Sequence, residues 1–199
     1  MLIAKVMIPE TQVPETRAGA EKPMERQTIN IVDAAATGAI SGLRLAAYVG
    51  AMLIAFVSLI ALVNDVLIVA GASVGIADLS FQRILGWAMA PVAWLMGIPW
   101  SDLVSVGGLL GIKTVLNEFL AYQELGVLAA NGDLQPRSIV IASYALCGFA
   151  NFGSLAILLG GIGGLVPERR PEVAQLGLRA ILAGSLTTFM TACLAGVLL

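Results

Sequence analysis

The 199-residue sequence contains no histidine, two cysteines and few charged residues. Because histidine is absent and Cys147 and Cys193 lie far apart in apolar runs, we expect neither a metal site nor a disulfide framework. Charged residues make up 12% of the chain, its net charge is −2, and no basic run indicates a nucleic-acid partner. These absences leave a protein dominated by apolar side chains.

The apolar content is too high for an ordinary soluble domain. Hydrophobic residues make up 58% of the chain, and its mean hydropathy is +0.91. The 22 glycines fit a membrane bundle, in which small residues let helices approach closely. The composition therefore predicts an all-α integral membrane protein whose environment is the lipid bilayer.

Three segments are expected along the chain. Residues 1–30 read as the last turns of an apolar helix followed by a polar, proline-containing loop, which indicates a missing upstream part. Residues 31–44 carry apolar side chains at helical spacing and predict an amphipathic helix at the membrane interface. Residues 45–199 are expected to form the membrane domain.

Within that domain, long uncharged stretches are expected to cross the bilayer, which needs about 20 apolar residues in a helix. The expected spans are residues 45–70, 83–100, 139–166 and 176–199. Pro91 predicts a kink in the second span. The run from Gly148 to Ser154 places an asparagine and a serine among glycines, which predicts that the third span is a broken helix.

The stretch 102–125 differs from these spans. The apolar run 103–112 is about 15 Å long as a helix, half of what a bilayer core requires. Lys113 and Glu118 follow it, and a carboxylate at membrane depth is kept only where it faces protein, water or a ligand. We therefore expect a re-entrant hairpin that lines a polar cavity.

Three motifs give the chain a specific resemblance. They are Gly-Ile-Lys-Thr-Val-Leu-Asn-Glu-Phe-Leu-Ala-Tyr at 111–122, Cys-Gly-Phe-Ala-Asn-Phe-Gly-Ser at 147–154, and Gly-Gly-Ile-Gly-Gly-Leu-Val-Pro-Glu-Arg-Arg at 160–170. In this order they resemble the C-terminal part of the concentrative nucleoside transporter family. The resemblance extends over nearly the whole chain.

The resemblance implies a site and a mechanism. In that family a transport domain moves against a trimeric scaffold, and two re-entrant hairpins meet around a nucleoside. It implies that Glu118, beside Asn117 in the motif, accepts hydrogen bonds from ribose hydroxyls. Asn151 and Ser154 are then expected to bind the ribose from the broken helix, with Phe149 beside the ligand. A carboxylate suits this task because it can accept from both hydroxyls of a vicinal diol.

The chain departs from the family by lacking the first hairpin, whose Gln-Thr-Glu segment reads the base. Most of the family's cation site lies in that missing half. The expectation is therefore the ribose-binding C-terminal half of a sodium- or proton-coupled nucleoside symporter in the plasma membrane. It would be multi-pass, free of cofactors, and partnered by an N-terminal half or assembled as a homotrimer.

Two other functions remain open from the residues. The chain could be a truncated or split-gene membrane fragment, or an accessory subunit, without transport activity of its own. A membrane-embedded enzyme using Glu118 as a base is disfavoured, because no histidine, metal cluster or activated nucleophile accompanies that glutamate. The role of Lys113, structural or functional, is also open.

Overall fold

The computed structural model describes residues 2–9, 11, 28–73, 75–76, 79–165 and 167–199, and within them every regular element is a helix. The helices are α1 (Leu2–Met7), α2 (Ile31–Ser73), α3 (Phe81–Leu95), η1 (Trp100–Asp102), α4 (Leu103–Val115), α5 (Glu118–Asn131), α6 (Pro136–Leu146), α7 (Phe152–Leu165), η2 (Pro167–Arg169) and α8 (Arg170–Leu198). This agrees with the predicted all-α class. Most of the polar stretch predicted as a loop lies outside the described residues. Two compact units are formed, residues 1–9 with 66–199 and residues 10–65.

Helix α2 begins with an asparagine cap. The Asn30 side chain accepts a hydrogen bond from the Asp33 amide at 2.8 Å, and the Asp33 carboxylate accepts one from the Ile29 amide at 2.9 Å. The helix then continues for 43 residues without a proline to interrupt it. The expected division between 31–44 and 45–70 is therefore not a helix boundary. An interfacial location for its first turns remains a prediction.

Helix α3 (Phe81–Leu95) ends before the predicted span at 83–100 does, and a membrane crossing there remains a prediction. It has 15 residues and is about 22 Å long, whereas a bilayer core is about 30 Å thick. The helix ends because Gly97 adopts a φ of +87°, a conformation that glycine takes without steric cost, and its amide donates to the Trp94 carbonyl at 2.9 Å. Pro91 lies inside the helix and does not end it.

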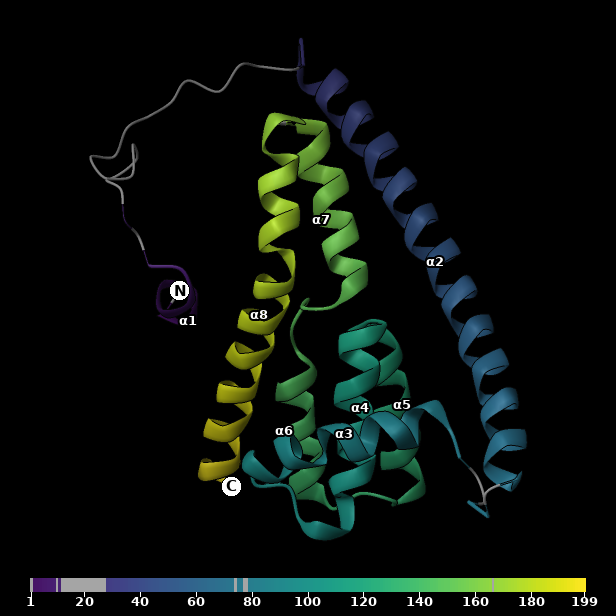
Figure 1. Cartoon of the computed structure of the whole chain (residues 1–199). Helices are drawn as coiled ribbons and strands as arrows, with labels where there is room; N and C mark the ends of the chain where they lie inside the picture. The colour runs from purple at the N-terminus through teal and green to yellow at the C-terminus, as the bar shows by residue number, and fades with distance from the viewer. Residues whose placement is uncertain (1, 10, 12–27, 74, 77–78, 166) are drawn as a thin grey trace. The chain divides into compact units, whose positions relative to one another are not determined.

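Helix α3 crosses α4, and glycines form the crossing point (Figure 1). A Cβ atom added at Gly107 of α4 would lie 2.5 Å from the Gly86 carbonyl oxygen and 3.0 Å from the Ala90 amide nitrogen. Both atoms belong to the backbone of α3 and cannot rotate away. The absence of side chains at this point therefore sets how closely the two helices approach.

We expect Gly107→Ala to lower the apparent melting temperature of the detergent-solubilised protein. Overpacking costs about 1–3 kcal/mol, which exceeds the gain of at most about 1 kcal/mol from replacing glycine with alanine in a helix. Gly126→Ala is the matched control, since nothing lies within 4 Å of a Cβ added there in α5. The control should melt at or above the wild-type temperature. Equal melting of both variants would show that the α3–α4 crossing is not tightly packed.

Helices α4 and α5 form a hairpin-shaped pair joined at Leu116 and Asn117 (Figure 1). At the end opposite this joint, the residue before α4 is tied to the residue before α6. The Asp102 carboxylate accepts from the Gln135 amide at 2.9 Å, and the Gln135 side chain donates to the Ser101 hydroxyl at 3.1 Å. Arg137 of α6 in turn donates to the Gly196 carbonyl of α8 at 2.6 Å. The pair has the predicted hairpin shape, and its entry into a membrane remains a prediction.

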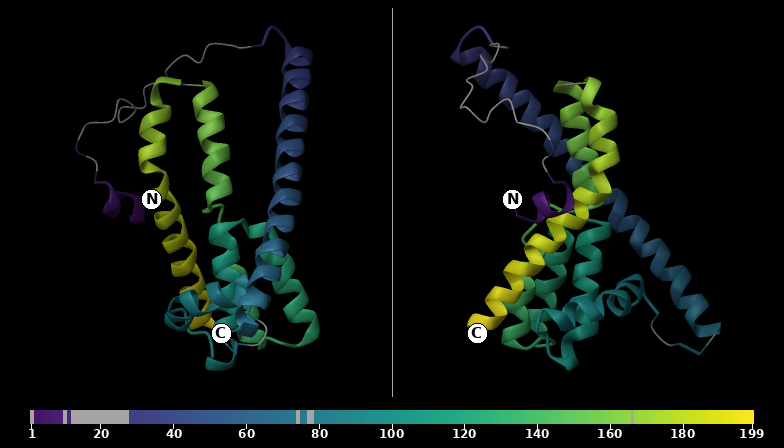
Figure 2. Two further views of the ribbon diagram at one scale, coloured as in Figure 1. Left: turned by 45° about the vertical axis from the view of Figure 1, so that its right-hand side comes forward. Right: turned by 60° about the vertical axis from the view of Figure 1, so that its left-hand side comes forward.

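Helix α8 packs against both α6 and α7, and the views in Figure 2 show it running past the two in turn. The predicted interruption of residues 139–166 is present, because α6 ends at Leu146 and α7 begins at Phe152. In the described part of the chain, one helix, Arg170–Leu198, is long and apolar enough to cross a bilayer. It covers residues 176–198 of the predicted span 176–199.

Candidate functional site

The first part of the site is the start of α5. Asn117 has extended backbone angles, and its side-chain oxygen accepts a hydrogen bond from the Leu120 amide at 2.9 Å. This is an N-cap, which satisfies one of the free amides of the first turn. Glu118 follows as the first helical residue, where the helix dipole favours a negative charge. The local sequence thus places a half-buried carboxylate at a helix N-terminus.

The second part is the start of α7, where the broken helix resumes. The Asn151 side-chain oxygen accepts from the Ser154 amide at 2.6 Å, and the Ser154 hydroxyl oxygen accepts from the Asn151 amide at 3.1 Å. These reciprocal bonds form a capping box. Asn151 is 1% exposed and Ser154 is 7% exposed, so both side chains are held in fixed positions.

One hydrogen bond joins the two parts. The Asn151 Nδ2 atom donates to the Glu118 Oε2 atom at 2.7 Å, across 33 residues of sequence. Because the amide oxygen of Asn151 caps α7 and its nitrogen faces Glu118, both ends of this side chain are used. In the described part of the chain, Asn151 is the one hydrogen-bond donor to the Glu118 carboxylate. The carboxylate retains acceptor capacity for a further donor.

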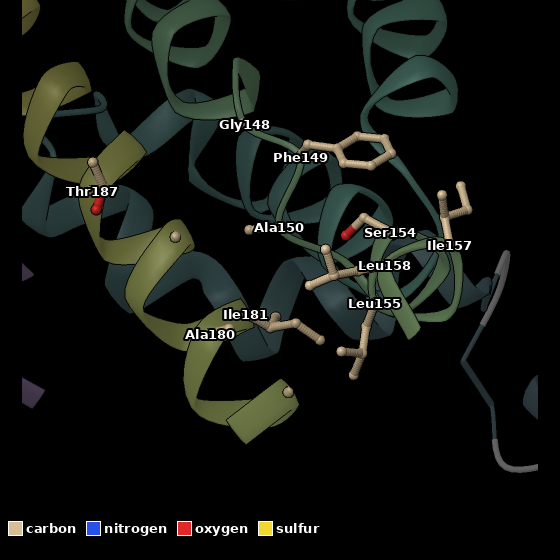
Figure 3. A pocket seen from close by; sticks show the side chains of 12 residues that line it. Gly148, Phe149, Ala150, Ser154, Leu155, Ile157, Leu158, Ala180, Ile181 and Thr187 are labelled. Atoms are coloured by element: carbon tan, nitrogen blue, oxygen red, sulfur yellow. The ribbon is translucent and has the colours of Figure 1, made fainter. Parts of the chain in front are cut away.

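Phe149 and Ser154 also line a cavity of ≈ 430 Å³ between the broken helix and α8 (Figure 3). Its wall is mostly apolar: Gly148, Phe149, Ala150, Ser154, Leu155, Ile157, Leu158, Gly177, Ala180, Ile181, Gly184 and Thr187. The Thr187 hydroxyl donates to the Ala183 carbonyl at 2.8 Å, and the Ser154 hydroxyl is bound to Asn151. The cavity therefore offers shape and apolar contact. Glu118 and Asn151 are not among the residues that line it, and Ser154, which does line it, is hydrogen-bonded to Asn151.

The structure brings together most of the residues that the sequence pointed to. Glu118, Asn151 and Ser154 form one hydrogen-bonded chain, and Asn117 stands next to it with its oxygen committed to the cap. Phe149 is 62% exposed and contributes to the cavity wall rather than to the polar chain. No three histidine, cysteine, aspartate or glutamate residues gather as a metal site among the described residues. A ligand role for the five predicted residues remains a prediction.

The sequence reasoning missed the contribution of α8. Gly177, Ile181, Gly184 and Thr187 of that helix line the cavity. A Cβ atom at Gly184 would lie 2.8 Å from the Cβ atom of Ala150, so the helix passes very close to the break. The spacing of seven residues between Gly177 and Gly184, which puts both on one helix face, is a signal that could have indicated this wall.

Comparisons with known proteins place the chain in a family. The family model described as "Na+ dependent nucleoside transporter C-terminus" matches residues 1–196. The chain is 44% identical over 198 residues to the uncharacterized transporter YutK of Bacillus subtilis, covering 99% of this chain and 48% of that protein. It is 41% identical over 202 residues to the nucleoside permease NupC of Helicobacter pylori, covering 99% of this chain and 47% of that protein.

The fold comparison agrees. A solved structure of CNTnw in an inward-facing substrate-bound state is similar with a TM-score of 0.84 and 43% identity, over 98% of this chain and 46% of that chain. The chain thus spans about half the length of these relatives. They are transporters and not enzymes, which removes the enzymatic interpretation of Glu118. Because the family model matches nearly the whole chain, this protein belongs to the nucleoside transporter family, in the C-terminal part that the model describes.

Proposed function

We propose that this chain is the ribose-binding C-terminal half of a cation-coupled nucleoside symporter of the plasma membrane. The observation that carries the proposal is the 2.7 Å hydrogen bond between Asn151 and Glu118. It joins two helix N-termini, at α5 and α7, that exist only because the chain breaks its helices there. Interrupted helices of this kind supply substrate sites in membrane transporters.

The chemistry of the site suits an uncharged sugar with neighbouring hydroxyls. The Glu118 carboxylate accepts hydrogen bonds from the two ribose hydroxyls, since an ionised carboxylate has two acceptor oxygens and no donor. Asn151 holds the carboxylate in place, and the apolar cavity beside it accommodates the less polar face of the ligand. A hydrogen bond to a charged partner contributes about 1.5–3 kcal/mol, so the diol is a large part of recognition.

Sodium is the coupling cation that we propose, because the matched family is described as sodium dependent. Among the residues that the structure describes, no three histidine, cysteine, aspartate or glutamate residues gather to hold a metal ion. The proposal places most of the cation site, and the contacts to the base, in an N-terminal half. We also propose that the protein crosses the membrane several times and assembles as a homotrimer.

The test is a hybrid transporter in which this chain follows the N-terminal half of the Helicobacter pylori permease. Expressed in cells without other nucleoside transporters, the hybrid is expected to accumulate labelled uridine when an inward sodium gradient is present. The 199-residue chain alone, and the N-terminal half alone, are the controls and should not accumulate it.

A hybrid that inserts into the membrane but takes up no uridine would contradict the proposal and favour a fragment without transport activity. Accumulation by the chain alone would contradict the division of the site between two halves. If a proton gradient drove uridine uptake at the same rate as the sodium gradient, sodium would be rejected as the coupling ion. The proposed ribose site would be unaffected by that result.

A further inference from the structure

The break between α6 and α7 leaves two helix ends with backbone groups that need partners. Helix α6 ends at Leu146, so its last carbonyls lose the amides that a continued helix would supply. In a continued helix the Ser143 carbonyl would accept from the Cys147 amide. That amide instead donates to the Tyr144 carbonyl at 3.3 Å. The Ser143 carbonyl is therefore available to a donor from outside the helix.

Tyr122 of α5 supplies that donor. Its hydroxyl donates to the Ser143 carbonyl oxygen at 2.6 Å, across 21 residues of sequence. This distance lies within the usual range for a hydroxyl donor. Helix α5 packs against α6, so the bond crosses a helix interface. Tyr122 thus caps α6 at the point where the helix is interrupted.

The same helix, α5, also contacts the other end of the break, which is the start of α7. There the Asn151 side chain donates to Glu118 at 2.7 Å. Glu118 and Tyr122 are four residues apart, which puts them on one face of α5, about 6 Å apart along its axis. One turn of α5 therefore bridges the break, with Tyr122 bonded to the end of α6 and Glu118 to the start of α7.

The chain between these two attachments is short and tightly turned. It consists of residues 144–150, in which the Gly148 amide donates to the Leu146 carbonyl at 2.7 Å. A shift in the last turn of α6 would be passed along this short connection to Asn151. The bond from Tyr122 opposes such a shift, because it ties the end of α6 to the helix that carries Glu118.

We propose that Tyr122 is a positioning residue of the ligand site. By fixing the last turn of α6, its hydroxyl sets where the chain enters α7 and so holds Asn151 in place to donate to Glu118. This inference rests on the proposed function. Because Tyr122 is 36% exposed, water can satisfy the Ser143 carbonyl when the hydroxyl is removed, but water would not tie that carbonyl to α5.

The test is Tyr122→Phe in the hybrid transporter, which removes the hydroxyl and keeps the ring. The readout is the preference for uridine over 2′,3′-dideoxyuridine, which lacks both ribose hydroxyls, taken as the ratio of their apparent affinities. We expect this preference to fall about three- to tenfold, the value of one neutral hydrogen bond. Tyr144→Phe is the matched control, since that exposed tyrosine of α6 makes no hydroxyl hydrogen bond within the described residues. The control should keep the wild-type preference.

A double-mutant cycle separates positioning from a general contribution to stability. Because Tyr122 acts through the Glu118 carboxylate, Tyr122→Phe should have little further effect on the preference in the Glu118→Gln variant. A tyrosine that only stabilises the fold would lower the uptake of both nucleosides equally and leave the preference unchanged. That result, or effects that multiply in the double variant, would overturn the inference.

Failure of this inference is distinguishable from failure of the proposed function. If Glu118→Gln leaves the preference intact, the ribose site itself is wrong. If Glu118→Gln removes the preference and Tyr122→Phe leaves it intact, the role of Tyr122 alone is rejected.

If Tyr122→Phe does not reach the membrane, a structure of the unmodified hybrid with bound uridine takes its place. A Tyr122 hydroxyl within about 3.0 Å of the Ser143 carbonyl oxygen, with Asn151 still bonded to Glu118, would support the inference. A hydroxyl farther from that oxygen, or bonded to the nucleoside, would overturn it.

Discussion

Glu118→Gln in the hybrid transporter is expected to weaken the apparent affinity for uridine by about ten- to a hundredfold. Glutamine keeps the size and shape of the side chain but replaces two anionic acceptor oxygens by one carbonyl and an NH2 donor. A hydrogen bond to a charged partner contributes about 1.5–3 kcal/mol, and 1.4 kcal/mol corresponds to tenfold in affinity. The measurement is the concentration dependence of uridine uptake.

Glu124→Gln is the matched control, because Glu124 lies on the same helix, α5, and takes no part in the hydrogen bonds described above for Asn117, Glu118, Asn151 and Ser154. It should leave the apparent affinity at the wild-type value. The effect of Glu118→Gln should be much smaller for 2′,3′-dideoxyuridine, because this analogue lacks both ribose hydroxyls and cannot donate them to the carboxylate. An equal loss for both ligands would show that Glu118 is structural or ion-coupling and does not recognise ribose.

Asn151→Asp is expected to abolish most of the uptake, by roughly a hundredfold or more, while the fold is retained. Aspartate is as good an N-cap as asparagine, so the start of α7 keeps its hydrogen bond from the Ser154 amide. In the wild type, the Asn151 side-chain nitrogen donates to the Glu118 carboxylate at 2.7 Å. In the variant, a carboxylate oxygen that can only accept replaces this nitrogen. Two like charges 4 Å apart repel by about 4 kcal/mol at an effective dielectric constant of 20.

The uptake rate and the melting temperature in detergent should be measured together for this variant. Asn131→Asp makes the same chemical change at the exposed end of α5 and should match the wild type in both. Asn151→Asp transporting at the wild-type rate would show that the hydrogen bond to Glu118 has no functional weight. A large fall in melting temperature would instead indicate that the cap, and not the ligand site, had been damaged.

The sequence predicted where the helices break but not which residues at the two breaks contact each other. The breaks at 116–117 and 147–151 were expected because polar side chains interrupt apolar runs near glycines. The contact between Glu118 and Asn151 joins residues 33 positions apart, and periodicity cannot place such residues together. The resemblance to the transporter family was needed to put both in one site.

The ends of two helices differ from the bounds predicted for the membrane segments. The span at 83–100 was predicted from its apolar composition, whereas the left-handed turn at Gly97 ends α3 earlier. The division of residues 31–70 into two helices was predicted because apolar side chains at helical spacing are followed by an uncharged stretch, whereas a single helix, α2, runs through both. Composition reports the environment of a helix and does not determine where it ends.

The burial of Lys113 was also beyond sequence reasoning. A lysine near the end of an apolar run can extend to the membrane surface along its own stem. Whether Lys113 extends to the surface or is buried depends on α8. Ser185 and Phe189 of that helix contact the Lys113 ammonium, and they lie 72 and 76 positions further along the chain. The sequence therefore left its role open, and the tertiary packing gives it a partner.

A structure of the hybrid transporter with bound uridine, determined by cryo-electron microscopy, tests the central claim most directly. We predict that the ribose hydroxyls lie within hydrogen-bond distance of the Glu118 carboxylate, about 2.5–3.0 Å, with Asn151 still at the start of α7. Uridine bound with its ribose beyond about 3.5 Å from Glu118, and with no water between them, would contradict the account.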